Sequence, residues 1–144
     1  MRMANMIKPS IILLAGIGST GMAATPQGDA TAVALTRCLD DAANASTAGQ
    51  TQCEVDAARA YDRRMNAAYA ILMRTLPRPA AQTLRQTQQA WLAFRDAESK
   101  ARGALFATRQ GTMYVPMQAA GATVIVRDRA LQLESDARIV AIDS

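Results

Sequence analysis

Hydrophobic spacing constrains the fold of this chain more than any other feature. Between residues 51 and 76, apolar side chains recur at alternating steps of three and four residues, which is the period of one buried helical face. This stripe consists of Val55, Ala58, Tyr61, Met65, Ala68 and Leu72. Segments on either side show a similar spacing and are separated by proline, glycine or small polar residues. The sequence therefore predicts an all-α fold, a small bundle of about four helices, one short and three long.

The first two helices are bounded by a small polar loop. A short helix is expected at 32–43, because its apolar residues share one stripe. Residues 44–50 are small and polar and include Gly49, so they are predicted to form the loop. Thr51 and Glu54 have the spacing of a capping box, which predicts that the second helix starts there.

Prolines and glycines define the later helices. Pro77 and Pro79 are expected to end the second helix. The third helix is predicted at 80–108, before Gly111. Pro116 suits the first turn of a fourth helix, which is expected to extend to about Ile139.

The first 23 residues predict a secretory signal peptide. Arg2 and Lys8 supply a positive start, residues 11–17 an apolar stretch, and residues 21–23 a small-residue cleavage site. The apolar stretch is far shorter than the roughly 20 residues that span a bilayer, which favours a removable signal over a retained anchor. We therefore expect a periplasmic or secreted protein that is not stably inserted in a membrane after cleavage.

Charge and length limit the partners and the number of domains. The formal net charge is +4, and it falls to +2 when Arg2 and Lys8 are removed. Acidic and basic residues are interleaved, so no clustered basic face is expected and nucleic-acid binding is not predicted. Residues 24–30 are predicted to be a loose leader. Residues 31–144 suffice for one domain with one core.

Cys38 and Cys53 are the two cysteines of the chain. Disulfides persist in oxidising compartments, so export favours a bond between them. Such a bond closes a loop of about 15 residues, for which the chain-entropy model gives about 3 kcal/mol. The alternative, a metal site, lacks further ligands because the chain has no histidine. No metal or cofactor is predicted.

The absence of histidine also argues against an enzyme. It removes the commonest general base and the nucleophile pairs that depend on it. A pair of carboxylates could still hydrolyse a glycoside, and the acids considered for this role are Asp62, Asp96, Glu98 and Asp128. Each has an arginine nearby in the sequence, which predicts ordinary ion pairs. We therefore expect a non-catalytic protein.

Polar residues interrupt the expected buried faces of the second and third helices. They are Asp62, Asn66 and Tyr69 in the second helix and Gln88, Trp91 and Arg95 in the third. A buried Arg95 needs an anionic partner, and Asp62 is the natural candidate. The predicted role of this network is structural, because buried polar groups can fix the register of packed helices.

These motifs together resemble a known family. The pattern is Cys38, Cys53, Asp62-x-x-Met65-Asn66-x-x-Tyr69-x-x-Leu72, Leu84-Arg85-x-x-Gln88-x-x-Trp91-x-x-x-Arg95-Asp96, Gly111-Thr112 and Arg129-x-x-x-Leu133. It is similar to the LprI-like lysozyme-inhibitor family of small exported bacterial proteins, over residues 31–133. The family usually has two further cysteines, where this chain has Ser99 and, by spacing, about Gly121. Their joint absence supports the pairing of the two that remain.

The resemblance implies a protein partner, a lysozyme or another peptidoglycan hydrolase, whose cleft the chain would occlude. An immunity protein against a wall-degrading toxin is one form of this function. Rigid loops suit such a role, and the two candidates are 44–51 and 109–115. In the second loop, Arg109, Thr112 and Tyr114 are the predicted contact residues.

The alternative function is a non-inhibitory role in envelope assembly through pairing of helix faces. Met113, Met117 and the apolar residues 139–142 could form the surface for it. The oligomeric state is left open.

Overall fold

The computed structural model describes residues 28–142. Within this range the chain folds into four α-helices: α1 (Ala30–Asp40), α2 (Thr47–Thr75), α3 (Arg78–Ala107) and α4 (Tyr114–Val140). A short 3₁₀ helix, η1 (Ala42–Asn44), links α1 to α2. The prediction of an all-α bundle with one short and three long helices is confirmed. The predicted signal peptide, residues 1–23, lies outside the described residues.

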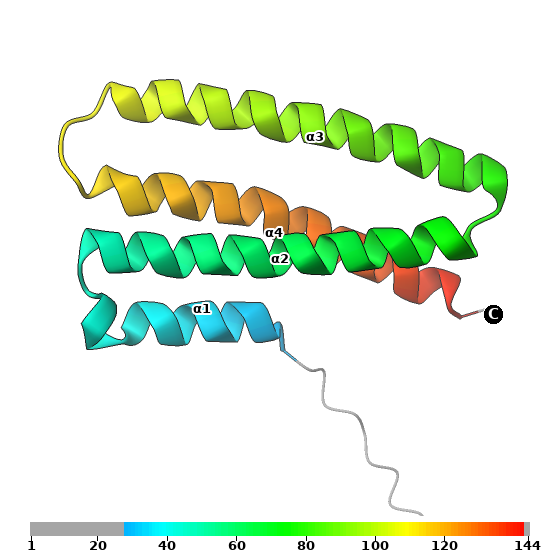
Figure 1. Ribbon diagram of the computed structural model, residues 1–144, viewed down its shortest axis with the longest axis horizontal. Helices are drawn as coiled ribbons and strands as arrows, with labels where there is room; N and C mark the ends of the chain where they lie inside the picture. The colour runs from blue at the N-terminus through cyan, green and yellow to red at the C-terminus, as the bar shows by residue number, and fades with distance from the viewer. Residues whose placement is uncertain (1–27, 143–144) are drawn as a thin grey trace, which may run out of the picture.

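Successive helices run in opposite directions (Figure 1). α1 lies along α2, α2 packs closely against α4, and α3 lies farther from both. The α1–α2 and α3–α4 connections are at the same end of the bundle, whereas the α2–α3 turn and the end of α4 are at the opposite end (Figure 1). The two loops predicted to bind a partner, 44–51 and 109–115, therefore lie at the same end of the molecule.

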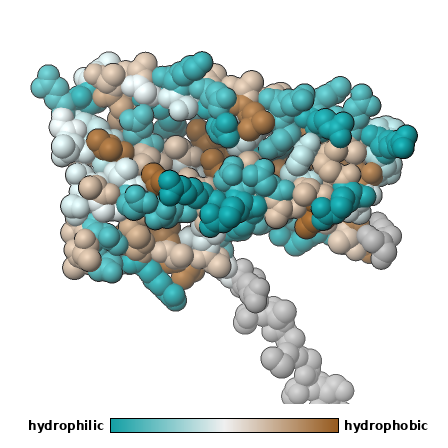
Figure 2. All heavy atoms as spheres, viewed as in Figure 1, coloured by the Kyte–Doolittle hydropathy of each residue, from teal (hydrophilic) through white to brown (hydrophobic). Residues whose placement is uncertain are grey.

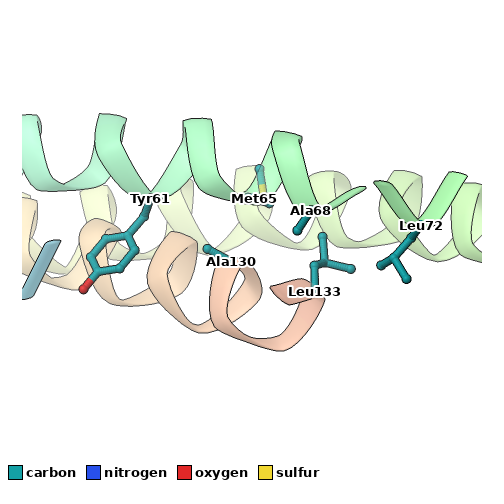
Figure 3. Close-up of a cluster of buried hydrophobic side chains, with 6 residues drawn as sticks. All are labelled: Tyr61, Met65, Ala68, Leu72, Ala130 and Leu133. Atoms are coloured by element: carbon teal, nitrogen blue, oxygen red, sulfur yellow. The ribbon is translucent and has the colours of Figure 1, made fainter. Parts of the chain in front are cut away.

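The core is formed between α2 and α4. Its buried members are Tyr61, Met65, Ala68 and Leu72 from α2 and Ala130 and Leu133 from α4. In Figure 3, Tyr61, Ala68 and Leu72 point towards α4, and Leu133 points back towards α2. Alanine at both surfaces lets the two backbones approach closely.

The predicted stripe of α2 is confirmed from Tyr61 onwards and shifts by one position before it. Val55 and Ala58 are only partly buried, whereas Glu54 and Ala57 are buried. Glu54, which lies outside the predicted stripe, is therefore buried in place of Val55.

The start of α2 is four residues earlier than predicted. Ser46 is the N-cap, and its Oγ accepts a hydrogen bond from the Gly49 N–H at 3.0 Å. Thr51 does not form a capping box, because its Oγ1 donates to the Thr47 carbonyl at 2.6 Å inside the helix. Most of the predicted loop 44–50 is thus helical, and Gly49 permits its tight approach to Asn44.

Two other boundaries also differ from the prediction. Asp29 caps α1, so this helix begins at Ala30, two residues before the predicted start at residue 32. Pro79 lies in the first turn of α3, where its missing N–H costs little, instead of ending α2. The prediction for α4 is confirmed, because this helix begins at Tyr114 and Pro116 lies in its first turn.

The disulfide joins Cys38 of α1 to Cys53 of α2, with their Cα atoms 5.7 Å apart. This confirms the predicted pairing. α1 has no fully buried residue of its own, so the disulfide is a principal attachment of this helix to the bundle. None of the helices in residues 28–142 is both long enough and apolar enough to cross a bilayer.

Exposed hydrophobic side chains are spread over several helices. On the face shown in Figure 2 they form separate groups among polar residues. The most exposed are Phe94, Leu105, Met113, Val115, Met117, Ile139 and Ile142. Met113 and Met117 lie at the loop end, whereas Ile139 and Ile142 lie at the other end of α4.

Candidate functional site

The α3–α4 loop is short and held at both ends. The Arg109 N–H donates to the Phe106 carbonyl at 3.0 Å, and the Val115 N–H donates to the Thr112 carbonyl at 3.1 Å. Gly111 has a φ of 112°, a conformation that favours glycine, so the turn depends on this residue. Arg109 and Thr112 are both exposed. Among the described residues, no acidic side chain pairs with the Arg109 guanidinium.

Tyr114 is placed differently from Arg109 and Thr112. It is the first residue of α4 and is half-buried. Its ring centroid lies 6.5 Å from that of Phe106, with the rings tilted by 49°. This contact joins the end of α3 to the start of α4, so Tyr114 supports the loop more than it projects from it.

A groove of about 460 Å³ opens beside this loop, between α1, the start of α2 and the start of α4. The residues that line it are Leu39, Thr47, Gln50, Glu54, Met113, Pro116, Met117 and Ala120. Residues of the other nominated segment, 44–51, form part of its wall. The loop and the groove together make the end of the bundle the candidate binding surface.

The predicted polar network is divided between separate contacts. Asp62 accepts a hydrogen bond from Asn66 at 3.0 Å, and Arg95 pairs with its neighbour Asp96 at 2.8 Å. The predicted Asp62–Arg95 ion pair is therefore not formed, because each residue has another partner. Arg95 instead lies over the Trp91 ring, 5.6 Å from its centroid.

The remaining two members of that predicted network are Tyr69 and Gln88, and no hydrogen bond joins them in the described part of the chain. Tyr69 packs against the core cluster. Gln88 is buried, and its Oε1 accepts a hydrogen bond from Arg129 Nε at 2.9 Å. Its Nε2 lies 3.6 Å from the Met65 sulfur.

Arg129 is the buried cation of the bundle in place of Arg95. Its side chain bridges Gln88 on α3 and Gln132 on α4, and its Nη2 atom is buried without a hydrogen-bond partner. Burial lowers the pKa of Arg129, and the carboxylate of Asp136 partly opposes this effect. Arg129 had appeared in the sequence only as part of a family motif. Its place four residues before Leu133 puts it on the same helical face as that buried residue, and this spacing is the sequence signal that indicates its burial.

A second polar cluster, which the sequence did not reveal, ties three elements together. The Asp29 carboxylate caps α1 and accepts hydrogen bonds from the Tyr61 hydroxyl, at 2.6 Å, and from Arg64. Arg64 also makes a two-bond contact with Glu134 of α4, with both distances 2.7 Å. The partners are 32 to 70 residues apart in sequence, so no local pattern could indicate them.

The pKa values of this cluster follow from its burial and hydrogen bonds. Burial alone would raise the pKa of Asp29, but the hydrogen bonds from Tyr61, Arg64 and the backbone outweigh it and lower that pKa. Burial and the Asp29 carboxylate raise the pKa of Tyr61 to about 12. The hydrogen bonds with Glu134 raise the pKa of Arg64.

The acids considered for glycoside hydrolysis have structural contacts. Arg95–Asp96, Arg102–Glu98 and Arg127–Asp128 form the expected ion pairs at 2.8, 3.0 and 2.8 Å. The fourth acid, Asp62, bonds to Asn66. Among residues 28–142, no three acidic, histidine or cysteine side chains gather in an arrangement able to hold a metal ion.

Comparisons with known proteins identify a family and a similar crystal structure. The model of the family described as lysozyme inhibitor LprI matches residues 24–133. The crystal structure is that of an uncharacterized protein from Burkholderia thailandensis, with 37% sequence identity and a TM-score of 0.74. The match covers 78% of this chain and 56% of that chain, so this chain spans just over half of that protein. No curated protein is significantly similar.

Proposed function

The chain belongs to the LprI lysozyme-inhibitor family, and from this premise we propose that it binds a lysozyme or another peptidoglycan hydrolase and blocks its cleft. The family match, which extends over most of the chain, is the observation that carries the proposal. A periplasmic or secreted location fits it, because peptidoglycan lies outside the cytoplasmic membrane. The predicted signal peptide at residues 1–23 would provide the export.

The α3–α4 loop is the proposed blocking element. An inhibitor gains affinity when its contact residues are already ordered before binding. The loop has backbone hydrogen bonds at both ends, and Tyr114 contacts Phe106 beneath it. Arg109 is exposed and has no acidic partner within the described chain. Thr112, also exposed, would border the contact.

Arg109 supplies a guanidinium group, which could bind the catalytic carboxylates in a glycosidase cleft. Glycoside hydrolases generally carry two catalytic carboxylates on either side of the scissile bond. A guanidinium can bind a carboxylate through two parallel hydrogen bonds, which combines charge with orientation. The proposed mechanism is therefore insertion of the loop, with Arg109 against the catalytic acids. The small net charge gives little long-range attraction to a strongly basic enzyme, which favours a neutral or acidic hydrolase, such as a toxin for which the chain is the immunity protein.

The test uses oxidised protein purified after export in a bacterial host. It is incubated with a panel of lysozymes and bacterial peptidoglycan hydrolases, and bound partners are assayed by the clearing of cell-wall suspensions. We expect inhibition near a one-to-one ratio. Arg109→Ala should weaken the inhibition constant by about tenfold, which corresponds to about 1.4 kcal/mol.

Arg85→Ala is the matched control, because Arg85 is exposed in the first third of α3, away from the loop end. It should leave inhibition unchanged. Equal inhibition by wild type and Arg109→Ala would remove the loop from the mechanism. Failure to bind any hydrolase would contradict the proposed function itself.

The second candidate function is envelope assembly through helix faces. Ile139 and Ile142 are 61% and 76% exposed, and Met113 and Met117 are also more than half exposed. Exposed apolar residues of this size can pair with another protein or with a second copy. Light scattering coupled to size-exclusion chromatography distinguishes the outcomes. A concentration-dependent dimer that Ile139→Lys dissolves would support assembly, and a monomer at all concentrations would contradict self-assembly.

A further inference from the structure

Glu54 is an acid in an unusual place. It lies in the second turn of α2, is only 8% exposed, and lines the groove at the loop end. Its backbone carbonyl accepts a hydrogen bond from Thr123 at 3.0 Å, which fixes this turn of α2 against α4. Within the described chain, however, no side chain donates a hydrogen bond or forms an ion pair with its carboxylate.

An unpaired acid in a largely buried position is costly. A buried charge is normally paired or fully hydrogen-bonded, because the low-dielectric interior does not replace its hydration. The carboxylate oxygens of Glu54 nevertheless remain accessible to solvent. Among the described residues, Arg129 Nη2 is the sole side-chain nitrogen or oxygen that is both fully buried and without a hydrogen-bond partner. The unpaired Glu54 oxygens are therefore not fully buried, and the groove that Glu54 lines is their route to solvent.

The groove around Glu54 has the shape and chemistry to bind a long basic side chain. Most of its walls are apolar, with Leu39 on one side and Pro116, Met117 and Ala120 on the other. None of its lining residues is basic. Long basic side chains bury their methylene stems against apolar surfaces while the charged head finds a polar partner. Such a side chain would cover the walls and supply the missing counter-charge at once.

We propose that this groove receives a lysine or arginine side chain of the protein partner, with Glu54 as the carboxylate that binds its charged head. This inference rests on the proposed function for the identity of the partner as a hydrolase, but not for the chemistry of the groove. Arg109 and Glu54 would then present opposite charges at the same end of the bundle. A partner with an acidic cleft and a basic side chain beside that cleft would match both.

The chemistry of the groove is tested with a small probe, n-butylguanidinium, which reproduces an arginine side chain. Titrated into the ¹⁵N-labelled oxidised protein, it should cause saturable shifts at the amides of Gln50, Met117 and Ala120. n-Butylurea, which has nearly the same shape and no charge, should bind at least fivefold more weakly. Absence of saturable shifts with the cation, or equal binding of the two probes, would overturn the proposal.

Variants separate charge from shape. Glu54→Gln keeps the size of the side chain and should weaken n-butylguanidinium binding at least fivefold without lowering the melting temperature. Asp56→Asn is the matched control, because Asp56 is an exposed acid on the same helix. Ala120→Leu keeps Glu54 and narrows the groove, so it should also abolish binding. Unchanged binding by Glu54→Gln would overturn the assignment of the carboxylate.

The hydrolase assay separates this inference from the proposed function. If a hydrolase is inhibited and Glu54→Gln inhibits it at least fivefold less well, both stand. If Glu54→Gln inhibits as well as the wild type, the groove is not part of the interface and the inference fails while the proposed function holds. If no hydrolase binds but the probe binds through Glu54, the proposed function fails and the groove remains a receptor for a basic side chain of another partner.

Discussion

Asp29 shows how one residue can attach a peripheral helix to the core. α1 contributes no fully buried side chain, so hydrophobic burial alone holds it weakly. The Asp29 carboxylate caps this helix and at the same time accepts the Tyr61 hydroxyl hydrogen bond from α2. Arg64 joins the same carboxylate to Glu134 of α4. A change in charge at Asp29 therefore alters contacts of three helices.

The Asp29–Tyr61 hydrogen bond predicts a stability that falls at both extremes of pH. The pKa of Asp29 is lowered from 3.8, so its contribution is present above about pH 4 and is lost as the pH falls through the lower folded value. The pKa of Tyr61 is raised from 10.0 to about 12, so its contribution is complete below pH 10 and is lost as the pH rises towards 12. Tyr61→Phe should lower the free energy of unfolding at pH 7 by about 2 kcal/mol, as expected for a hydrogen bond to a charged group.

Urea unfolding at pH 3, 7 and 11 measures this effect. The difference between Tyr61→Phe and the wild type should shrink at pH 3 and at pH 11. Tyr69→Phe is the control, since Tyr69 packs against the same core and has no hydrogen bond from its hydroxyl among the described contacts. A pH-independent difference, or an equal loss in Tyr69→Phe, would contradict the assignment.

At the scale of helices, glycine has two different roles. A Cβ added at Gly49 would lie 2.7 Å from the Cα atom and 2.8 Å from the carbonyl oxygen of Asn44, which are backbone atoms that cannot move aside cheaply. Gly49 therefore allows η1 to fold back against the first turn of α2. A Cβ at Gly103 would meet its nearest side-chain atom at 3.9 Å, an ordinary contact.

The two glycines should respond in opposite directions to the same substitution. Alanine is favoured over glycine by about 1 kcal/mol within a helix. Gly103→Ala should therefore raise the free energy of unfolding by about 0.5 to 1 kcal/mol. Gly49→Ala should lower it by more than about 1 kcal/mol because the steric clash outweighs that propensity. Thermal melts of both variants are the measurement, and stabilisation by Gly49→Ala would disprove the close approach to Asn44.

Local patterns predicted the helices well and their first turns poorly. The three-and-four spacing from Tyr61 to Leu72 identifies the buried face of α2, because burial there depends on periodicity alone. Ser46 and Thr51 are both good capping residues, and the choice between them depends on whether the chain can fit η1 against Gly49, which is a tertiary contact. The disulfide was predictable because the chain contains two cysteines and no competing partner.

The candidate site was only partly predictable for the same reason. Arg109 and Thr112 follow from the position of a loop between two long helices, and the structure leaves both exposed. The sequence predicts Tyr114 as part of that loop, but it starts α4 and contacts Phe106. The sequence predicts Glu54 as a capping residue, and no local pattern indicates that α1 and α4 enclose a groove around it.

Across the whole molecule, the packing is uneven. α2 and α4 form the close pair that contains the core, whereas α3 contributes only Ala81 and Gln88 as buried residues. A cavity of about 180 Å³ lies between α3 and α4, lined in part by Ser99, Arg102 and Gln118. The family resemblance places a cysteine at Ser99, so a covalent tie at this interface is absent from the chain.

This uneven packing predicts that α3 opens before the α2–α4 pair unfolds. Segments with few buried apolar contacts exchange their amide hydrogens through local openings of low free energy. In hydrogen–deuterium exchange of the native oxidised protein, peptides within 89–106 should therefore exchange at least tenfold faster than peptides within 61–72 and 126–137. Leu92→Ala is the matched substitution because Leu92 is exposed on α3 and should not change this order. Equal protection of α3 and α2 would contradict this prediction and would mean that the bundle opens as one cooperative unit.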